Sequence, residues 1–180
     1  MVSLDGYVEG PTGELGWSEP GPELHKHFND QYLNGEIDTS IYGRKLYELM
    51  SGYWPDQESE PDVPEVEREF SKAWKNVKKL VYSTTLKSVD WNSELVRKID
   101  PDHIQQLKKQ PGGHIDIGGA TLAAEFIKLN LVDECWLYIH PKTLGGGKPM
   151  FPKGHGMQLS FIDSDQFPCG VVLLRYKCIK

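Results

Sequence analysis

The chain has 180 residues, of which 38% are hydrophobic and 11% aromatic, and it carries a formal net charge of -6. This length and composition fit one globular domain, residues 1–180, with a sizeable core. The acidic balance, without any run of lysine or arginine, argues against nucleic acid and anionic membranes as partners. No apolar run reaches the roughly 20 residues that a bilayer requires, and the N-terminus lacks a secretory pattern. We therefore expect a cytoplasmic protein.

The cysteines and histidines indicate neither disulfides nor a metal. Cys135, Cys169 and Cys178 are an odd number without C-x-x-C spacing, and two of them lie in apolar, strand-like runs. They are expected to be buried free thiols. The six histidines show no zinc-binding spacing. We expect no metal site.

The first residues alternate like a strand that arrives at a turn, with only four residues before Asp5. Because strands commonly have about five residues, we expect either a shortened first strand or residues missing upstream of Met1.

Hydrophobic periodicity then predicts alternating helices and strands. Apolar residues every three or four positions, with proline near the start or glycine at the end, indicate helices. Alternating or continuous branched runs indicate strands. The predicted helices are 22–35, 44–52, 62–77 (with Asp62 as its cap), 101–111 and 120–130, and the predicted strands are 39–42, 80–85, 115–117, 135–139, 159–162 and 171–179. The acidic segment 55–61 between prolines is predicted to be a mobile loop. This order predicts an α/β domain with a mostly parallel sheet and a C-terminal antiparallel hairpin.

The most informative stretch is Ile115–Leu122, where two branched apolar residues run into a double glycine that opens a helix. Glycines at such a junction let a ligand approach the backbone, and the free N–H groups of the helix attract phosphate. The arrangement recurs where the strand 39–42 meets Gly43 and Arg44. A tight structural turn is the alternative reading of each junction taken alone.

Five segments in order resemble the reductase domain of riboflavin biosynthesis, in a stand-alone form. They are Ser3–Gly6, Ile41–Glu48, Ser83–Leu86, Ile117–Leu122 and Leu144–Phe151. The resemblance covers nearly the whole chain. It implies a dihydrofolate reductase-like, three-layer α/β/α fold with a central mixed sheet of about eight strands, and a site for NADPH, with NADH possible.

The resemblance also implies roles for individual residues. On the substrate side it places Asp5 and Trp17, and it suggests a further wall from Gly145, Lys148 and Phe151. The residues implied to bind the cofactor are Gly43, Arg44, Ser83, Thr84, Thr85, Gly118, Gly119, Ala120 and Thr121. For Asp5 the alternative is an ordinary turn residue, because Asp-Gly forms turns readily.

The chain departs from the family pattern at three positions. Ile117 stands where the riboflavin-pathway enzymes have a carboxylate, and Tyr7 where they have a basic residue. Both changes argue against a ribose-phosphate substrate. Thr84 stands where close relatives have an arginine that would favour the 2'-phosphate of NADPH.

The first hypothesis for function is an NAD(P)H-dependent reductase of a small pyrimidine- or pterin-like heterocycle, similar to 5-amino-6-(5-phosphoribosylamino)uracil reductase. A non-catalytic nucleotide or small-molecule binding protein that keeps the fold is the alternative, and a dimeric scaffold with purely structural glycines is a third. The run 171–179 is apolar on both faces. Because one of those faces needs cover, and because the resemblance implies dimers, we expect a homodimer.

Overall fold

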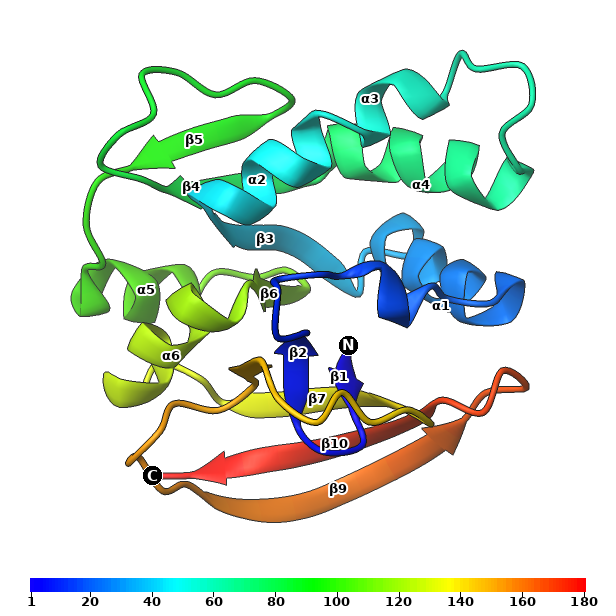
Figure 1. Ribbon diagram of the computed structural model, residues 1–180. Coiled ribbons are helices and arrows are strands. Elements are labelled where there is room, and N and C mark those ends of the chain that lie inside the picture. The colour runs from blue at the N-terminus through cyan, green and yellow to red at the C-terminus, as the bar shows by residue number, and fades with distance from the viewer. The chain divides into compact units, whose positions relative to one another are not determined.

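The computed structural model describes residues 1–180, and its elements are shown in Figure 1. No helix combines the length and the apolar character that a membrane crossing needs. The helices are η1 (Gly16–Ser18), α1 (Pro22–Leu33), α2 (Arg44–Ser51), α3 (Trp54–Gln57), α4 (Glu65–Asn76), α5 (Pro101–Leu107) and α6 (Ala120–Lys128). The strands are β1 (Val2–Ser3), β2 (Tyr7–Glu9), β3 (Ile37–Gly43), β4 (Lys78–Tyr82), β5 (Ser93–Val96), β6 (His114–Gly118), β7 (Glu134–His140), β8 (Lys148–Pro149), β9 (Gln158–Gln166) and β10 (Val172–Ile179).

The chain divides into two compact units, which are described separately. The first unit combines Met1–Leu24 with Ala123–Lys180, and the second unit is His25–Leu122.

The second unit contains a four-stranded parallel sheet in the order β5-β4-β3-β6. Parallel strands buried on both faces need continuous apolar sequence, and β4 meets this with Leu80, Val81 and Tyr82. Figure 1 shows α2 and α4 over β3 and β4. Aromatic side chains from these helices, with residues of both strands, form the core cluster Tyr42, Tyr47, Phe70, Trp74 and Val81.

The first unit contains a mixed sheet in the order β1-β7-β10-β9 and a small antiparallel pair, β2-β8. β1 is parallel to β7, whereas β10 is antiparallel to both β7 and β9. The predicted C-terminal hairpin and the α/β class are therefore confirmed. The first strand, β1, is short, as expected, with only two residues. The strands are hydrogen-bonded as two four-stranded sheets and one pair.

Several predicted element boundaries were wrong. β4 ends at Tyr82, so Ser83–Thr85 lie beyond the strand. The N-cap of α4 is Pro64 instead of Asp62, without a side-chain cap. Part of the predicted loop 55–61 belongs to the short helix α3. Asn130, with φ 55°, adopts the left-handed conformation predicted after α6.

Candidate functional site

Two glycine-containing junctions lie next to each other at one edge of the second unit's sheet. β3 ends at Gly43 and runs directly into α2, while β6 ends at Gly118 and continues through Gly119 into α6. β3 and β6 are adjacent and parallel, with Tyr42 opposite Gly118, so both helices begin at the carboxyl ends of strands. A Cβ built on Gly43 would lie 3.8 Å from Cβ of Leu122 in α6. Two helix starts with free N–H groups therefore meet at one place, which suits an anion.

Glycine is needed at both positions of the second junction, but for different physical reasons. A Cβ on Gly118 would lie 2.5 Å from Cδ2 of Leu46 and 3.2 Å from the Tyr42 ring, so packing excludes a side chain. Gly119 has φ +91°, is exposed, and meets no atom closer than 3.9 Å at its Cβ position. Glycine is required at this residue by the backbone conformation, and the space beside it is open to a ligand.

The first turns of both helices supply further groups to this edge. Gly43 caps α2 without a side-chain hydrogen bond, so the first N–H groups of α2 have no side-chain partner there. Arg44 lies 3.5 Å from Glu48, and both side chains are 46% exposed, so this ion pair is weak and the guanidinium is available to phosphate. Ala120 and Thr121 form the first turn of α6. The structure thus brings together six of the nine residues predicted for the cofactor.

The other three, Ser83, Thr84 and Thr85, follow β4 at the same edge, because β4 is parallel to β3. The Ser83 hydroxyl accepts hydrogen bonds from the N–H groups of Thr85 (3.2 Å) and Leu86 (3.0 Å), and so closes a turn. Arg97 Nη1 donates to the carbonyls of Ser83 (3.0 Å) and Leu86 (2.8 Å). Thr84 and Thr85 are exposed. The Thr85 hydroxyl lies within hydrogen-bond distance of the Ser83 hydroxyl, at 3.4 Å.

Asp5, in the first unit, holds the turn after β1 against the backbone of Leu144 and Gly145. Its carboxylate accepts hydrogen bonds from the Ser3 hydroxyl (2.6 Å) and from the N–H groups of Leu144 (3.0 Å) and Gly145 (2.8 Å). The bond from Ser3, and then those from Leu144 and Gly145, lower the pKa of Asp5. An ionised, fully engaged carboxylate is a poor proton donor. This geometry favours a positioning role for Asp5.

Trp17 lies on η1, and its ring meets the imidazole of His140 edge-on, with the ring centroids 5.5 Å apart at 80°. Trp17 Nε1 and His140 Nε2 are buried without hydrogen-bond partners. Burial, followed by the charge of the N-terminal amino group, lowers the pKa of His140, so the imidazole is neutral at neutral pH. The sequence alone did not single out His140, because its spacing to other polar residues carries no motif.

Asp116 of β6 is a second residue that the sequence analysis did not assign. Its Oδ1 accepts a 2.5 Å hydrogen bond from the Ser40 hydroxyl, and the Tyr32 hydroxyl lies 3.3 Å from the same oxygen of Ser40. Burial raises the pKa of Asp116 to about 6. Neighbouring residues of a strand face opposite sides, so Asp116 cannot replace the carboxylate missing at Ile117. The sequence signal that could have identified Asp116 is an acidic residue between two isoleucines, Ile115 and Ile117.

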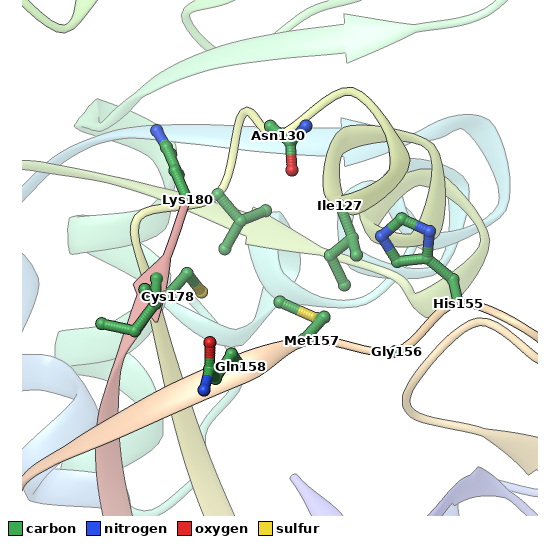
Figure 2. Close-up of a pocket in the computed structure, with 10 residues that line it drawn as sticks. Ile127, Asn130, His155, Gly156, Met157, Gln158, Cys178 and Lys180 are labelled. Atoms are coloured by element: carbon green, nitrogen blue, oxygen red, sulfur yellow. The ribbon is translucent and has the colours of Figure 1, made fainter.

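Two cavities lie away from the predicted residues. A space of about 70 Å³ in the first unit, shown in Figure 2, is lined by Ile127, Asn130, Val132, His155, Gly156, Met157, Gln158, Cys178, Ile179 and Lys180. Ligand pockets usually exceed about 300 Å³, so this space is too small for a heterocycle. A groove of about 440 Å³ in the second unit is lined by residues such as Ile37 and Lys78. These residues start β3 and β4, so the groove lies at the sheet edge opposite the glycine junctions.

Comparisons with known proteins identify the family and the fold. The family model described as RibD C-terminal domain matches residues 1–173. The uncharacterised protein YyaP of Bacillus subtilis is 38% identical over 177 residues, which covers 97% of this chain and 90% of YyaP. A structure from Shewanella sp. PV-4, named for riboflavin biosynthesis, has a TM-score of 0.71 and 22% identity, with 99% of this chain and 96% of that one covered. Dihydrofolate reductase from Enterococcus faecalis, complexed with NADP(H), has a TM-score of 0.60 and 15% identity, with 99% and 93% covered.

Proposed function

Since the chain belongs to the RibD C-terminal domain family, we propose that it is an NAD(P)H-dependent reductase of a small heterocycle resembling a pyrimidine or a pterin. A bound nicotinamide cofactor supplies the hydride, and the protein supplies binding, orientation and electrostatics. The residues proposed for the cofactor phosphates all belong to the second unit, and those proposed for the substrate, Asp5 and Trp17, belong to the first.

The observation that carries this proposal is the pair of glycine junctions at adjacent parallel strands. Two helix starts within contact distance present several N–H groups and the positive ends of two helix dipoles to one point. The pyrophosphate of a dinucleotide has two phosphates that need such donors. Gly119 leaves the space beside the backbone open, and Arg44 adds a planar cation. These residues fit NADPH or NADH.

The test is titration of the parent protein with NADPH and NADH, by calorimetry, beside a Gly119→Val variant. Valine at φ +91° is strained, and its branched side chain would block the approach of phosphate. We expect NADPH affinity to fall at least tenfold, and more than in Arg44→Ala, while circular dichroism shows a folded protein. If folded Gly119→Val binds NADPH as tightly as the parent, the assignment of the phosphates to this junction is wrong.

A non-catalytic nucleotide or small-molecule binding protein is the second candidate. Two observations favour it: β6 carries Ile117 instead of a carboxylate, and the ionised carboxylate of Asp5 is engaged by the Ser3 hydroxyl and by the backbone N–H groups of Leu144 and Gly145. NADPH oxidation against a panel of pterins, pyrimidines and flavins separates the two candidates. The binding protein would bind NADPH and oxidise it with none of them.

A further inference from the structure

Two of the three thiols of the chain lie against each other in the first unit. Sγ of Cys135 and Sγ of Cys178 are 3.7 Å apart, and the two residues are only 5% and 9% exposed. Cys169, contrary to the sequence expectation of a buried thiol, is exposed. The chain thus has one close, buried pair of thiols and one isolated thiol that can serve as its control.

The sheet of the first unit holds the two cysteines on one face. β7 and β10 are antiparallel neighbours, and Cys135 lies opposite Tyr176, two residues before Cys178. Alternate residues of a strand face the same side of a sheet, so both thiols project to that side. The Cys178 N–H also donates to the carbonyl of Asp133, at 2.7 Å. The paired backbones of two strands, and not a loop, therefore bring the sulfur atoms together.

One thiol of the pair borders the small cavity of the first unit. Cys178 lines the space of about 70 Å³ together with Met157 and His155, as Figure 2 shows. Cys135 is not one of the lining residues. A water molecule needs about 10–15 Å³ of such space, whereas benzene occupies a cavity of about 150 Å³. The cavity therefore has room for water or hydrogen peroxide beside Cys178, but not for an aromatic thiol reagent.

Burial keeps both thiols protonated at neutral pH. It raises the pKa of the Cys135 thiol to about 12, and it also raises the pKa of the Cys178 thiol. Because the thiolate is the reactive form, the first oxidation of the pair is slow. The second thiol then lies only 3.7 Å away, so its attack is favoured by proximity. The expected product is a disulfide and not a sulfinic acid.

We propose that Cys135 and Cys178 are a modification site at which hydrogen peroxide forms a disulfide between β7 and β10. The Cys178 sulfur attacks one peroxide oxygen, the O–O bond breaks, and water leaves with the thiol proton, so that a sulfenic acid remains. The Cys135 sulfur then attacks the Cys178 sulfur, the S–O bond breaks, and a second water molecule takes the Cys135 proton. The two thiols together lose two electrons, and the peroxide gains them.

The strand end that carries Cys178 can accommodate the bond. Bonded sulfur atoms are about 2.0 Å apart, so the two thiols must approach each other. Cys178 is the last but one residue of β10, and strand ends adjust at a lower free energy than strand centres. The disulfide would join residues 43 apart and enclose Leu144, whose N–H binds Asp5. It should therefore stabilise the folded first unit.

The test treats the reduced, folded protein with hydrogen peroxide and maps its cysteines by peptide mass spectrometry under non-reducing conditions. The proteins are the parent, Cys135→Ala, Cys178→Ala and Cys169→Ser, which is the matched control because it removes only the exposed thiol. Circular dichroism establishes that the alanine variants are folded. The parent and Cys169→Ser test the inference even if an alanine variant does not fold.

We expect peroxide to produce the linked Cys135–Cys178 peptides in the parent and in Cys169→Ser, and dithiothreitol to separate them. Oxidised Cys169→Ser should melt about 5–10 °C above its reduced form. In Cys135→Ala, peroxide should convert Cys178 to a sulfinic acid, which dithiothreitol does not reverse. Dithionitrobenzoate should react with Cys169 alone in the folded, reduced parent and with all three cysteines in urea.

The inference would be overturned if Cys135 and Cys178 both stayed reduced in the folded parent while peroxide oxidised Cys169. A sulfinic acid at Cys178 of the parent would also overturn it, because proximity would then not decide the product. So would a Cys135–Cys178 disulfide that forms only in urea, since the folded geometry would not select the pair. None of these measurements requires NADPH, so the reductase proposal is tested separately.

Discussion

Lys79 is a fully buried lysine whose ammonium group pairs with carbonyl groups instead of a carboxylate. Its Nζ donates hydrogen bonds to the carbonyl oxygens of Trp74 and, at 2.8 Å, of Val77, and it lies 4.4 Å from the centroid of the Trp74 ring. These carbonyls belong to the C-terminal end of α4, where the helix dipole favours a cation. The ammonium group of Lys79 therefore caps carbonyl groups at the C-terminal end of α4, while the rest of its side chain packs in the core.

Burial lowers the pKa of Lys79 to about 8 from an ordinary value of 10.5. Between these two values the unfolded chain binds more protons than the folded protein, so the free energy of unfolding should rise with pH. We expect an increase of up to about 3 kcal/mol between pH 8 and pH 10.5 that is absent in Lys79→Met. Urea denaturation over this range measures it, with the exposed neighbour Lys78→Met as the control. Equal pH profiles for the parent and Lys79→Met would show that the amine titrates normally.

Thr84 tests how the chain distinguishes NADPH from NADH. It is exposed, with no guanidinium of its own, although Arg97 is fixed on the neighbouring carbonyls of Ser83 and Leu86. The parent should discriminate poorly between the two cofactors. Thr84→Arg should raise NADPH affinity about tenfold, since a charged hydrogen bond contributes roughly 1.5–3 kcal/mol, and leave NADH affinity nearly unchanged.

Dissociation constants for both cofactors at low and high salt measure this effect, because a surface ion pair is screened by salt. Arg97→Ala is the companion variant. Strong NADPH selectivity in the parent that disappears in Arg97→Ala would assign the 2'-phosphate to Arg97. Equal gains for both cofactors in Thr84→Arg would place the 2'-phosphate away from this loop.

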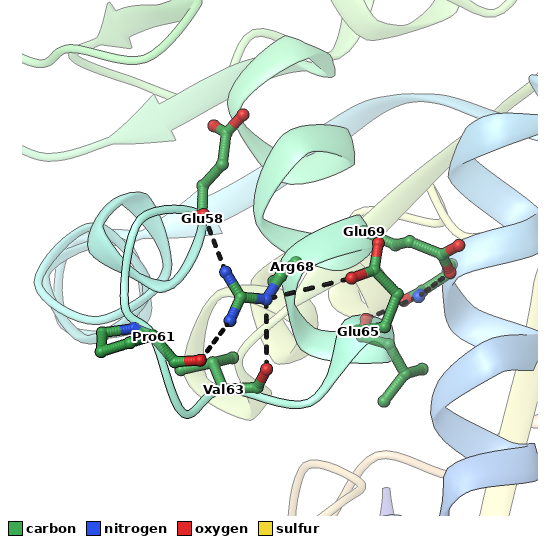
Figure 3. A network of polar contacts seen from close by, with 8 residues as sticks. Glu58, Pro61, Val63, Glu65, Arg68 and Glu69 are labelled. Carbon is green, nitrogen blue, oxygen red and sulfur yellow. Dashed lines mark hydrogen bonds and ion pairs between the residues drawn. The ribbon is translucent and has the colours of Figure 1, made fainter.

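At the level of elements, one arginine holds the acidic segment between α3 and α4, as Figure 3 shows. Arg68 donates from Nη2 to the carbonyl of Pro61 (2.8 Å), from Nε to that of Val63 (3.1 Å) and from Nη1 to that of Glu58 (3.4 Å). Glu65 lies 3.9 Å from Nε. A guanidinium can reach three carbonyls because its donors point in fixed, different directions.

The segment predicted from sequence to be mobile should therefore be ordered as long as Arg68 is present. Arg68→Lys retains the charge but has one donor centre, so it should lose about 1–3 kcal/mol of unfolding free energy. It should also be cut faster after Glu58 by a glutamate-specific protease, whereas the bond after Glu60 resists cleavage because Pro61 follows it. Lys26→Ala, which breaks an exposed pair with Asp30, should change the stability by less than about 1 kcal/mol. Equal cleavage rates for the parent and Arg68→Lys would contradict this role.

The elements that were predicted correctly have local causes. Pro22 opens α1, and branched residues before Gly118 form β6, because these signals act within a few residues. β5 was not predicted, since Ser93–Val96 has few strand-forming residues and follows two residues with positive φ, Trp91 and Asn92. Its pairing with β4 fixes it, and that contact is not visible in the sequence of the strand itself.

The sequence predicted those parts of the candidate site that local backbone geometry forms. It did not predict the parts in which residues far apart in the chain come into contact. The glycine junctions could be read from Gly43 and Gly118–Gly119. The contact of Asp5 with Leu144 joins residues 139 apart in the chain, and the meeting of Trp17 with His140 depends on the same folding of the first unit. Only the structure could reveal these pairs.

For the whole molecule we predict a homodimer, and the structure suggests where it forms. β9 is the edge strand of the first unit's sheet, so one side of its backbone is available for pairing. Phe161 and Ile162 of β9 are 58% and 44% exposed, and Ile179 of β10 is 49% exposed. Exposed apolar side chains on an edge strand and its neighbour are typical of an interface.

Light scattering on the parent at micromolar concentration should give about twice the chain mass of 20.4 kDa, because an interface of the usual 1,200–2,000 Å² or so persists at that level. Phe161→Glu would bury a carboxylate in this interface and should produce monomers that remain folded. Thr143→Glu adds the same charge at an exposed loop residue outside β9 and β10, and it should stay dimeric. A monomeric parent would contradict the prediction of a homodimer. A dimeric Phe161→Glu would show that the interface does not include Phe161 of β9.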